Sequence, residues 1–276
     1  MKKVILFALL FLAAAIVSEA QPRIPLKKVS ELQMRAKIDD EEKMAGTRGA
    51  SIIWHPVQKK YYASFAGNTG YPMGVFDDKG NRLSSDDQTT MIDTRGLWYN
   101  PAAKSVSGNG FSETGWFTYT LDNSGMPTDL NVLIEGMNQP DAQSVGTYNT
   151  ANKRVLFLKG GRIFMYDNDG IAQDSSTAIH WGRRKIDGAS EDEDLSYAPE
   201  DYNYTTVVYT GAKGQELGVL NITNKQVELY DISTGFLTKI LTLPETAKTE
   251  AAFNFGYANG IYWLFNIELR KWIGYK

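Results

Sequence analysis

The segment Tyr166-Asp167-Asn168-Asp169-Gly170 decides the fold of this 276-residue chain, because its pattern recurs along the sequence. In each copy an apolar residue is followed by Asp, then two or three residues, then Gly. Successive aspartates are 45, 45 and 64 residues apart, and a charged insertion at about 183–202 accounts for the longer last interval. Self-similarity at such a period is typical of repeat architectures. The other copies are Phe76-Asp77-Asp78-Lys79-Gly80, Leu121-Asp122-Asn123-Ser124-Gly125 and Tyr230-Asp231-Ile232-Ser233-Thr234-Gly235.

A second series places an aromatic residue before a turn, once in each repeat. The segments around these turns alternate between apolar and polar residues or run apolar, as strands do. Each unit therefore predicts four antiparallel strands within roughly 40–50 residues, which is the blade of a β-propeller. Five such aromatics predict five blades, and they are Trp54, Trp98, Tyr148, Tyr209 and Tyr257.

The fifth blade has only three predicted strands before the chain ends. Because an unfinished blade leaves an exposed sheet edge, which β proteins avoid, we expect residues 23–29 to supply the missing outer strand and close the ring. Ser30-Glu31-Leu32-Gln33 then predicts a capping box that opens a short helix ending near Gly46. The alternative is six blades, if residues 23–50 form a blade of their own.

On these repeats the chain resembles the five-bladed β-propellers, and the resemblance spans nearly all of the sequence after the N-terminal segment. It concerns the architecture alone, because the tryptophan–aspartate dipeptides of the forty-residue repeat family and the double glycines of kelch repeats are absent. Five-bladed propellers include sugar-binding lectins and glycoside hydrolases. The resemblance therefore implies either binding or catalysis and does not choose between them.

The N-terminal segment has the three parts of a secretory signal peptide. Lys2 and Lys3 precede an apolar run from Val4 to Val17, and Ser18-Glu19-Ala20 follows with small residues at the cleavage positions. We expect residues 1–20 to be removed near Ala20, which leaves residues 21–276 as a single propeller domain. The protein is then secreted, periplasmic or on the cell surface, and no later apolar segment reaches the roughly 18 residues of a membrane span.

Composition excludes several classes of site and partner. The absence of cysteine excludes thiol nucleophiles, thiolate metal sites and disulfides. Without residues 1–20 the chain has 27 basic and 31 acidic residues and no basic stripe, which argues against nucleic acid. His55 and His180 do not form a spaced pair, and no phosphate loop or dinucleotide fingerprint is present, so we expect no metal and no cofactor.

The repeated residues favour structural roles. Each repeated Asp is expected to bond its own turn while the Gly takes a positive φ. A calcium site is not expected even at Asp167-Asn168-Asp169-Gly170, because two carboxylates and one amide provide too few oxygens for calcium. The aromatic series is expected to pack between blades rather than to form a platform for sugars. Gly160-Gly161 predicts a two-residue hairpin turn.

The candidate functional residues lie on the face whose loops vary in length and content, because variable loops on a rigid scaffold usually carry function. This irregular face is expected to present Asn68 and the charged insertion, whose tyrosines give it a capacity to dock on a partner. The candidate ligand-binding residues are Tyr71, Arg95 and Trp116. Four acidic residues precede the inner strands and would be the carboxylates of an enzyme: Asp93, Asp141, Asp201 and Glu250.

Three functional hypotheses follow. The favoured one is a non-catalytic propeller that binds a carbohydrate or a protein of the cell envelope or exterior through its irregular face. A glycan-active enzyme similar to glycoside hydrolases is the second, although the first blade has no acidic residue at the matching position. A structural subunit of a cell-envelope complex is the third.

Overall fold

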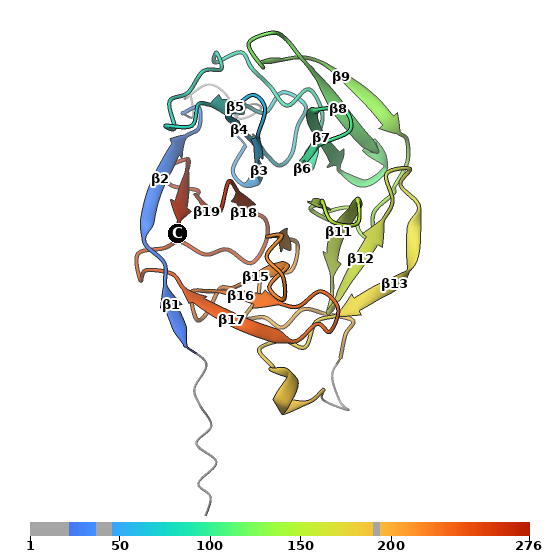
Figure 1. Ribbon diagram of the computed structural model, residues 1–276. Helices are drawn as coiled ribbons and strands as arrows, with labels where there is room; N and C mark the ends of the chain where they lie inside the picture. The colour runs from blue at the N-terminus through green and yellow to red at the C-terminus, as the bar shows by residue number, and fades with distance from the viewer. Residues whose placement is uncertain (1–21, 37–45, 190–193) are drawn as a thin grey trace, which may run out of the picture.

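The computed structural model describes residues 22–36, 46–189 and 194–276, and these form five β-sheets arranged around a central axis (Figure 1). The five-bladed propeller predicted from the repeats is confirmed, and the six-bladed alternative is wrong. The predicted signal peptide, residues 1–20, lies outside the described residues. Within the described part of the chain, no helix is long and apolar enough to cross a membrane.

Each blade is a meander that starts at the axis and runs outward (Figure 1). Blade 1 has three strands, whereas blades 2 to 5 have four or more. Blade 1 consists of β3 (Gly49–His55), β4 (Lys60–Phe65) and β5 (Met73–Phe76). Blade 2 consists of β6 (Thr94–Asn100), β7 (Ser105–Gly110), β8 (Trp116–Leu121) and β9 (Pro127–Ile134).

Blades 3 and 4 flank the charged insertion, which links them. Blade 3 consists of β10 (Thr147–Asn149), β11 (Arg154–Lys159), β12 (Arg162–Tyr166) and β13 (Ala172–Ala178). Blade 4 consists of β14 (Val208–Tyr209), β15 (Leu217–Asn221), β16 (Gln226–Tyr230) and β17 (Leu237–Thr242), with β1 (Arg23–Pro25) added outside β17. Two short 3-10 helices, η1 (Ser112–Thr114) and η2 (Lys185–Asp187), lie in connecting loops.

Blade 5 joins the two ends of the chain. It consists of β18 (Phe255–Ala258), β19 (Ile261–Asn266), β20 (Lys271–Tyr275) and, from the N-terminal region, β2 (Lys28–Gln33). Closure by an N-terminal strand is confirmed, but its predicted bounds need correction. Residues 28–33 pair antiparallel with β20, whereas residues 23–25 pair parallel with β17 of the neighbouring blade.

The predicted helix at Ser30-Glu31-Leu32-Gln33 is wrong, because these residues belong to β2. Along this strand Leu32 is fully buried and its neighbours Glu31 and Gln33 are exposed, and the buried Met34 follows in the same alternation. The edge of β20 offers the backbone of this segment a full ladder of hydrogen bonds, and the buried side chains cover the apolar face beside Trp272. Tertiary pairing therefore overrides the local capping-box pattern. The rest of the predicted helix falls largely on residues outside the described part.

Five apolar clusters of the described residues lie between adjacent blades, one at each blade junction, and a smaller sixth cluster lies near the axis. Strand β11 shows how an apolar run serves two of them. Val155 and Phe157 pack against blade 2, whereas Leu156 and Leu158 pack against blade 4. Because successive side chains of a strand point to opposite faces, a strand buried on both faces must be apolar throughout.

The repeated aspartates are turn residues, as predicted. Asp77, Asp122, Asp167 and Asp231 each accept backbone N–H bonds from residues two to four positions ahead, as in the bond of 2.9 Å from Ile171 N to Asp167 Oδ1. The glycine that closes each turn has a positive φ, between 69° and 88°. Hydrogen bonds donated by the Ser124 side chain and by backbone N–H groups of the turn lower the pKa of the Asp122 carboxyl.

The junction of β2 and β20 makes a pH-dependent contribution to stability. Glu31 accepts hydrogen bonds from Lys271 Nζ (2.8 Å) and Lys28 Nζ (2.7 Å), which lower the pKa of its carboxyl to about 2. All three side chains are partly exposed, so solvent screening limits the pair energy to about 0.5–1 kcal/mol. A lowered carboxyl pKa gives stability that is present above pH 4.5 and is lost as the pH falls towards 2.

We therefore expect Glu31→Gln to melt slightly below wild type at pH 7, and the difference to disappear between pH 4.5 and pH 2. Thermal unfolding of both proteins at pH 7, 4 and 2 measures this, and 1 M salt at pH 7 should shrink the same difference. A difference that stays constant down to pH 2 would show that the ion pair is not its source.

Candidate functional site

The two ends of the propeller axis differ in their loops. Inner strands β3, β6, β10, β14 and β18 all run from the irregular face to the opposite face, which carries the short turns after them and is called the turn face here. The irregular face carries the connections between blades, including the insertion between β13 and β14. The candidate residues from the sequence are expected on this irregular face.

The aromatic series packs between blades, as predicted. Trp54 packs against blade 5, Tyr148 against blade 2, Tyr209 against blade 3 and Tyr257 against blade 4, so each ring contacts the blade that precedes its own. In blade 2 the equivalent position is Tyr99, whose ring lies 4.7 Å from that of His55 in blade 1.

The second blade contributes two successive aromatics with different partners. Trp98, which the sequence series placed with the other four, lies one position earlier than Tyr99 and faces blade 3 instead. Its ring centre is 5.4 Å from that of Trp116 of its own blade, and both rings pack against blade 3. Trp98 is therefore also a packing residue, but it is not the equivalent of the other four. Alternation along the strand makes the difference, since neighbouring side chains point to opposite faces of a sheet.

Trp116 is buried rather than presented to solvent, which corrects its expected place on the irregular face. Its side chain is 2% exposed, lies between blades 2 and 3, and donates from Nε1 to the carbonyl of Asn138 at 3.1 Å. Tyr71 is partly buried, in the loop between β4 and β5, and its ring lies against Gly67. A ligand on the irregular face reaches part of Tyr71 and none of Trp116.

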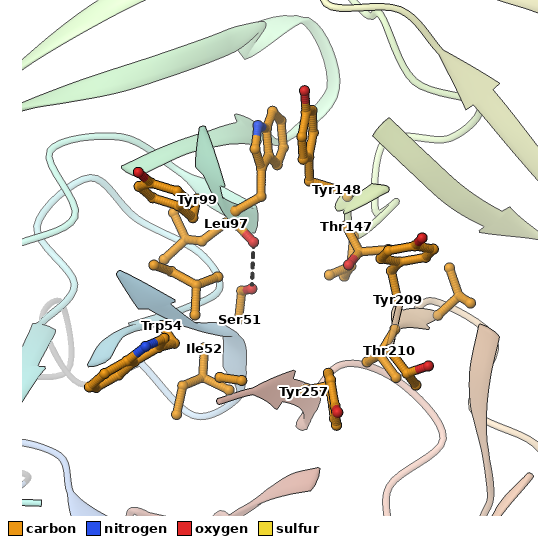
Figure 2. A pocket seen from close by; sticks show the side chains of 18 of the residues that line it. Ser51, Ile52, Trp54, Leu97, Tyr99, Thr147, Tyr148, Tyr209, Thr210 and Tyr257 are labelled. Carbon is orange, nitrogen blue, oxygen red and sulfur yellow. Dashed lines mark hydrogen bonds between the residues drawn. The ribbon is translucent and has the colours of Figure 1, made fainter. Parts of the chain in front are cut away.

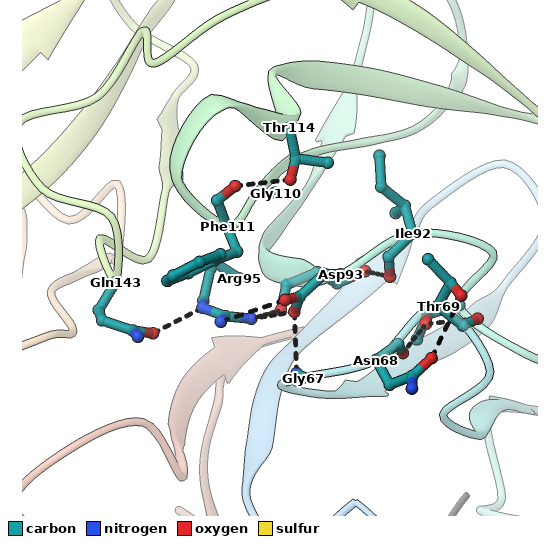
Figure 3. A network of polar contacts seen from close by, with 12 residues as sticks. Gly67, Asn68, Thr69, Ile92, Asp93, Arg95, Gly110, Phe111, Thr114 and Gln143 are labelled. Atoms are coloured by element: carbon teal, nitrogen blue, oxygen red, sulfur yellow. Dashed lines mark hydrogen bonds and ion pairs between the residues drawn. The ribbon is translucent and has the colours of Figure 1, made fainter. Parts of the chain in front are cut away.

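Asp93 and Arg95 form a buried network at the irregular end of the axis (Figure 3). Arg95 is 5% exposed and is ion-paired with Asp93, while its Nε donates to Gln143 Oε1 at 2.7 Å. Its guanidinium lies 4.7 Å from the ring centre of Phe111. Asp93 also accepts a bond of 3.0 Å from the backbone N–H of Gly67. The network therefore joins blades 1, 2 and 3, and the Asp93 carboxylate is already paired.

An apolar cluster lies beside this network at the irregular end of the axis. It consists of Ala66, Val145, Ala252 and Phe253, and the Arg95 guanidinium lies 5.7 Å from the ring centre of Phe253. The backbones of adjacent inner segments also meet here. Val145 bridges Thr206 in parallel pairing, and Asn254 N donates to the carbonyl of Gly49 at 2.8 Å.

The other end of the axis forms an open pit, which we call the axial pit (Figure 2). Its cavity volume is about 290 Å³, and residues of all five inner strands line it, from Ser51 and Val145 at the floor to the turn residues Pro56 and Asn259 at the mouth. The rings of Trp54, Tyr99, Tyr148, Tyr209 and Tyr257 stand around the mouth. Sequence reasoning placed function on the other face and missed this pit.

A larger hollow lies on the irregular face, and we call it the tyrosine groove. Its cavity volume is about 590 Å³. Blade 3 and the segment before it provide one wall with Asp141, Ser144, Leu158 and Lys159, and the insertion and the segment after it provide the other with Tyr197, Pro199, Glu200, Tyr202 and Tyr204. Of the four acidic residues predicted from the sequence, Asp141 alone lines this groove.

The hairpin turn at Gly160-Gly161 holds the insertion wall in place. The turn has two residues, as predicted, and Gly160 has a φ of 58°. Gly161 N donates to the carbonyl of Leu195 at 2.9 Å, and a Cβ on Gly160 would lie 2.6 Å from the carbonyl oxygens of Leu195 and Ser196. A glycine is therefore needed for the returning arm of the insertion to lie across this turn.

A buried carboxylate anchors both ends of the insertion to blade 4. Glu228, in β16, accepts hydrogen bonds from the hydroxyls of Tyr230 (2.6 Å) and Tyr202 (3.0 Å). The Tyr230 hydroxyl in turn accepts from the backbone N–H of Gly182, where the insertion begins. Burial, reinforced by the nearby Glu228, raises the pKa of both phenols, so they remain hydroxyl donors. No sequence motif pointed to this cluster.

The remaining acidic candidates have separate surroundings. Asp141 Oδ2 lies 3.6 Å from Lys159 Nζ. Asp201 is exposed and accepts the N–H of Ile222 through its backbone carbonyl, and the backbone carbonyl of Glu250 accepts from Asn203 Nδ2. Across the described residues, no group of three or more His, Cys, Asp or Glu side chains is placed to hold a metal ion.

Comparison with models of known protein families finds no match for the chain, and comparison with curated proteins finds none. Among solved structures, the chain is similar to the crystal structure of Myxococcus xanthus glutaminyl cyclase, with a TM-score of 0.53 and 11% identity over 93% of this chain and 98% of that chain.

Two further structures show weaker similarity. One is a nidogen/laminin complex, with a TM-score of 0.41 and 11% identity over 76% of this chain and 68% of that chain. The other is a streptogramin B lyase, with a TM-score of 0.38 and 15% identity over 87% of this chain and 65% of that chain. At these identities the similarities show the fold alone.

Proposed function

We propose that this protein is an exported, non-catalytic propeller that binds a carbohydrate in the tyrosine groove of its irregular face. The observation that carries the proposal is the pair of exposed rings on one wall, where Tyr197 is 76% exposed and Tyr204 is 53% exposed. A tyrosine ring offers a flat apolar face for a sugar ring together with a hydroxyl at its tip, and it does so at a low cost in conformational entropy.

The opposite wall supplies polar groups that suit sugar hydroxyls. Asp141 and Lys159 are each about half exposed, and they offer an acceptor and a donor at the rim. Ser144 is 2% exposed, lines the groove, and has a buried hydroxyl with no hydrogen-bond partner. Because an unpaired buried hydroxyl costs free energy, a ligand hydroxyl that reaches Ser144 gains more than one that merely replaces water.

The states of Asp93 and Asp141 support binding over hydrolysis. A glycosidase needs one carboxyl group to donate a proton and a second to attack or to activate water, with the pair about 5–10 Å apart. Asp93 is ion-paired with the buried Arg95, and Asp141 lies beside Lys159. Each of these carboxylates already has a cationic partner, so neither belongs to a free pair of this kind.

The test is a glycan array probed with the mature chain and with two variants of Tyr204. We expect Tyr204→Ala to reduce binding at least tenfold and Tyr204→Phe, which keeps the ring, to reduce it less than threefold. Ile171→Ala, which removes an exposed side chain outside the groove, is the control and should bind as wild type does.

Three outcomes would contradict the proposal. Binding that survives Tyr204→Ala places the ligand elsewhere, and an array with no bound glycan removes the carbohydrate. Hydrolysis of a glycan that disappears in Asp141→Asn would establish the enzyme instead.

A protein partner on the same face is the second candidate, and the exposure of Ile186 favours it. This side chain, in the insertion beyond the groove, is 80% exposed. If Ile186→Ser weakens capture of an envelope protein while Tyr204→Ala does not, the partner binds the outer surface of the insertion rather than the groove.

A further inference from the structure

We propose that the axial pit is a second binding site, separate from the tyrosine groove, for one small uncharged polyhydroxylated ring of monosaccharide size. The pit opens on the turn face, whereas the groove lies on the irregular face (Figure 2). Val145 lies at its floor and packs in the apolar cluster with Ala252 and Phe253.

The lining of the pit selects an uncharged ligand. It includes no Asp, Glu, Lys, Arg or His side chain among the described residues. Burial raises the pKa of the Tyr209 and Tyr257 phenols, so these hydroxyls remain neutral at physiological pH. A charged group that enters such a site loses its hydration and finds no counter-charge, which is costly.

The backbone groups that line the pit favour a ligand with many hydrogen-bond donors and acceptors. Strands β3, β6, β10, β14 and β18 each pair with one strand of their own sheet, so each is an edge strand of its blade, and at Gly49 the other edge is already bonded to Asn254. Their N–H and C=O groups need partners, since every strand edge carries unpaired donors and acceptors. The hydroxyl of Ser51 already uses one of these edges, donating to the carbonyl of Leu97 at 3.5 Å.

The size of the pit limits the ligand to a single ring. Its 290 Å³ is the space of about ten water molecules at about 30 Å³ each. A pyranose with its hydroxyls fills most of this space and presents donors and acceptors around its whole perimeter. That distribution matches a lining made of five similar strand edges, in which polar groups surround the ligand on every side.

The rings at the mouth are preorganised for a ligand. Trp54, Tyr148, Tyr209 and Tyr257 are held by their packing against the preceding blades, so binding does not have to order them. Preordered side chains lower the entropic cost of association. Thr147 projects from β10 towards the middle of the pit, so a larger residue at this position would occupy the space of the ligand (Figure 2).

The experiment uses the mature chain and ligand-observed saturation-transfer NMR with D-glucose, D-galactose and D-mannose. We expect at least one of these to bind with a millimolar Kd. Its analogues with a carboxylate at C6 or an ammonium at C2 should bind at least tenfold more weakly. Thr147→Phe should reduce the affinity for the neutral sugar at least tenfold.

Three further variants keep the test decisive. Thr147→Val removes the hydroxyl without changing the shape of the side chain, and it should weaken binding several-fold. It replaces Thr147→Phe in the test if Thr147→Phe does not fold. Ile171→Ala, outside both hollows, should leave the sugar signal unchanged. A signal that Tyr204→Ala removes and Thr147→Phe keeps would place the sugar in the groove, so failure of the groove proposal and failure of this one give different results. The proposal is overturned if no neutral sugar binds, if Thr147→Phe and Thr147→Val both bind as wild type does, or if the charged analogues bind equally well.

Discussion

Replacing Leu32 by Ala is expected to lower the free energy of unfolding by about 2–5 kcal/mol, because the side chain is fully buried. Leu32 packs from β2 into the cluster that joins blade 5 to blade 1, beside Trp272 and Phe265. A loss of this size corresponds to a fall in Tm of roughly 5–15 °C for a chain of this length. Thermal unfolding measures it.

Val29→Ala is the matched control, since it removes an aliphatic side chain from the same strand. Val29 is 52% exposed, so we expect a change within about 0.5 kcal/mol. Equal losses in the two variants would mean that β2 does not close the ring in solution.

Deletions extend the same comparison to the whole strand. A chain that lacks residues 22–33 loses β1 and β2 and uncovers the edge of β20, and we expect it not to fold. A chain that lacks residues 188–200 keeps every strand that the structure describes and should melt much closer to wild type.

Replacing Gly96 by Ala is expected to cost about 3 kcal/mol or more, because two inner strands meet at this glycine. An added Cβ would lie 2.4 Å from the backbone nitrogen of Gly146 and 2.7 Å from its carbonyl oxygen. Both atoms belong to the backbone of blade 3, so relief requires blades 2 and 3 to move apart. Because the ring is closed, such a movement strains the other blade contacts as well.

Gly218→Ala tests whether the cost arises from this backbone contact. Its Cβ would meet a methyl group of Val208 at 2.8 Å, and the next atoms are 3.4 Å away. A side chain can turn aside where a backbone cannot, so we expect about 1 kcal/mol at Gly218. Thermal unfolding of the two variants should separate their Tm values by several degrees, and equal values would contradict the argument.

The sequence by itself determined the class of fold and favoured five blades over six. The Asp-to-Gly turns carry their own geometry, because Asp167 bonds the backbone of its own turn and Gly170 takes the positive φ. Interactions within five residues do not depend on the rest of the fold, so their spacing shows where the blades lie. The packing role of the aromatic series could also be predicted from the recurrence of one aromatic near the end of each inner strand, although the series includes Trp98 where the equivalent residue is Tyr99.

The tertiary structure decided how the ring closes and where the hollows lie. Leu32 lies in a strand because β20, about 240 residues later, offers an unpaired edge, and no local pattern records that partner. The sequence around Trp116 does not show whether its side chain is exposed, but the contact with blade 3 buries it. Asp93 precedes an inner strand as Asp141 does, yet its carboxylate is ion-paired with the buried Arg95, whereas Asp141 lies beside the half-exposed Lys159.

The two hollows depend entirely on contacts between distant segments. The tyrosine groove exists because Leu195 and Ser196 lie across the Gly160 turn, and the axial pit exists because Val145 and Phe253 meet below it. Side chains that converge from several blades leave no spacing signal in the sequence. Short-range hydrogen bonds and strand alternation can be predicted from neighbouring residues, whereas cavities are set by which remote surfaces come together and by how much space they leave.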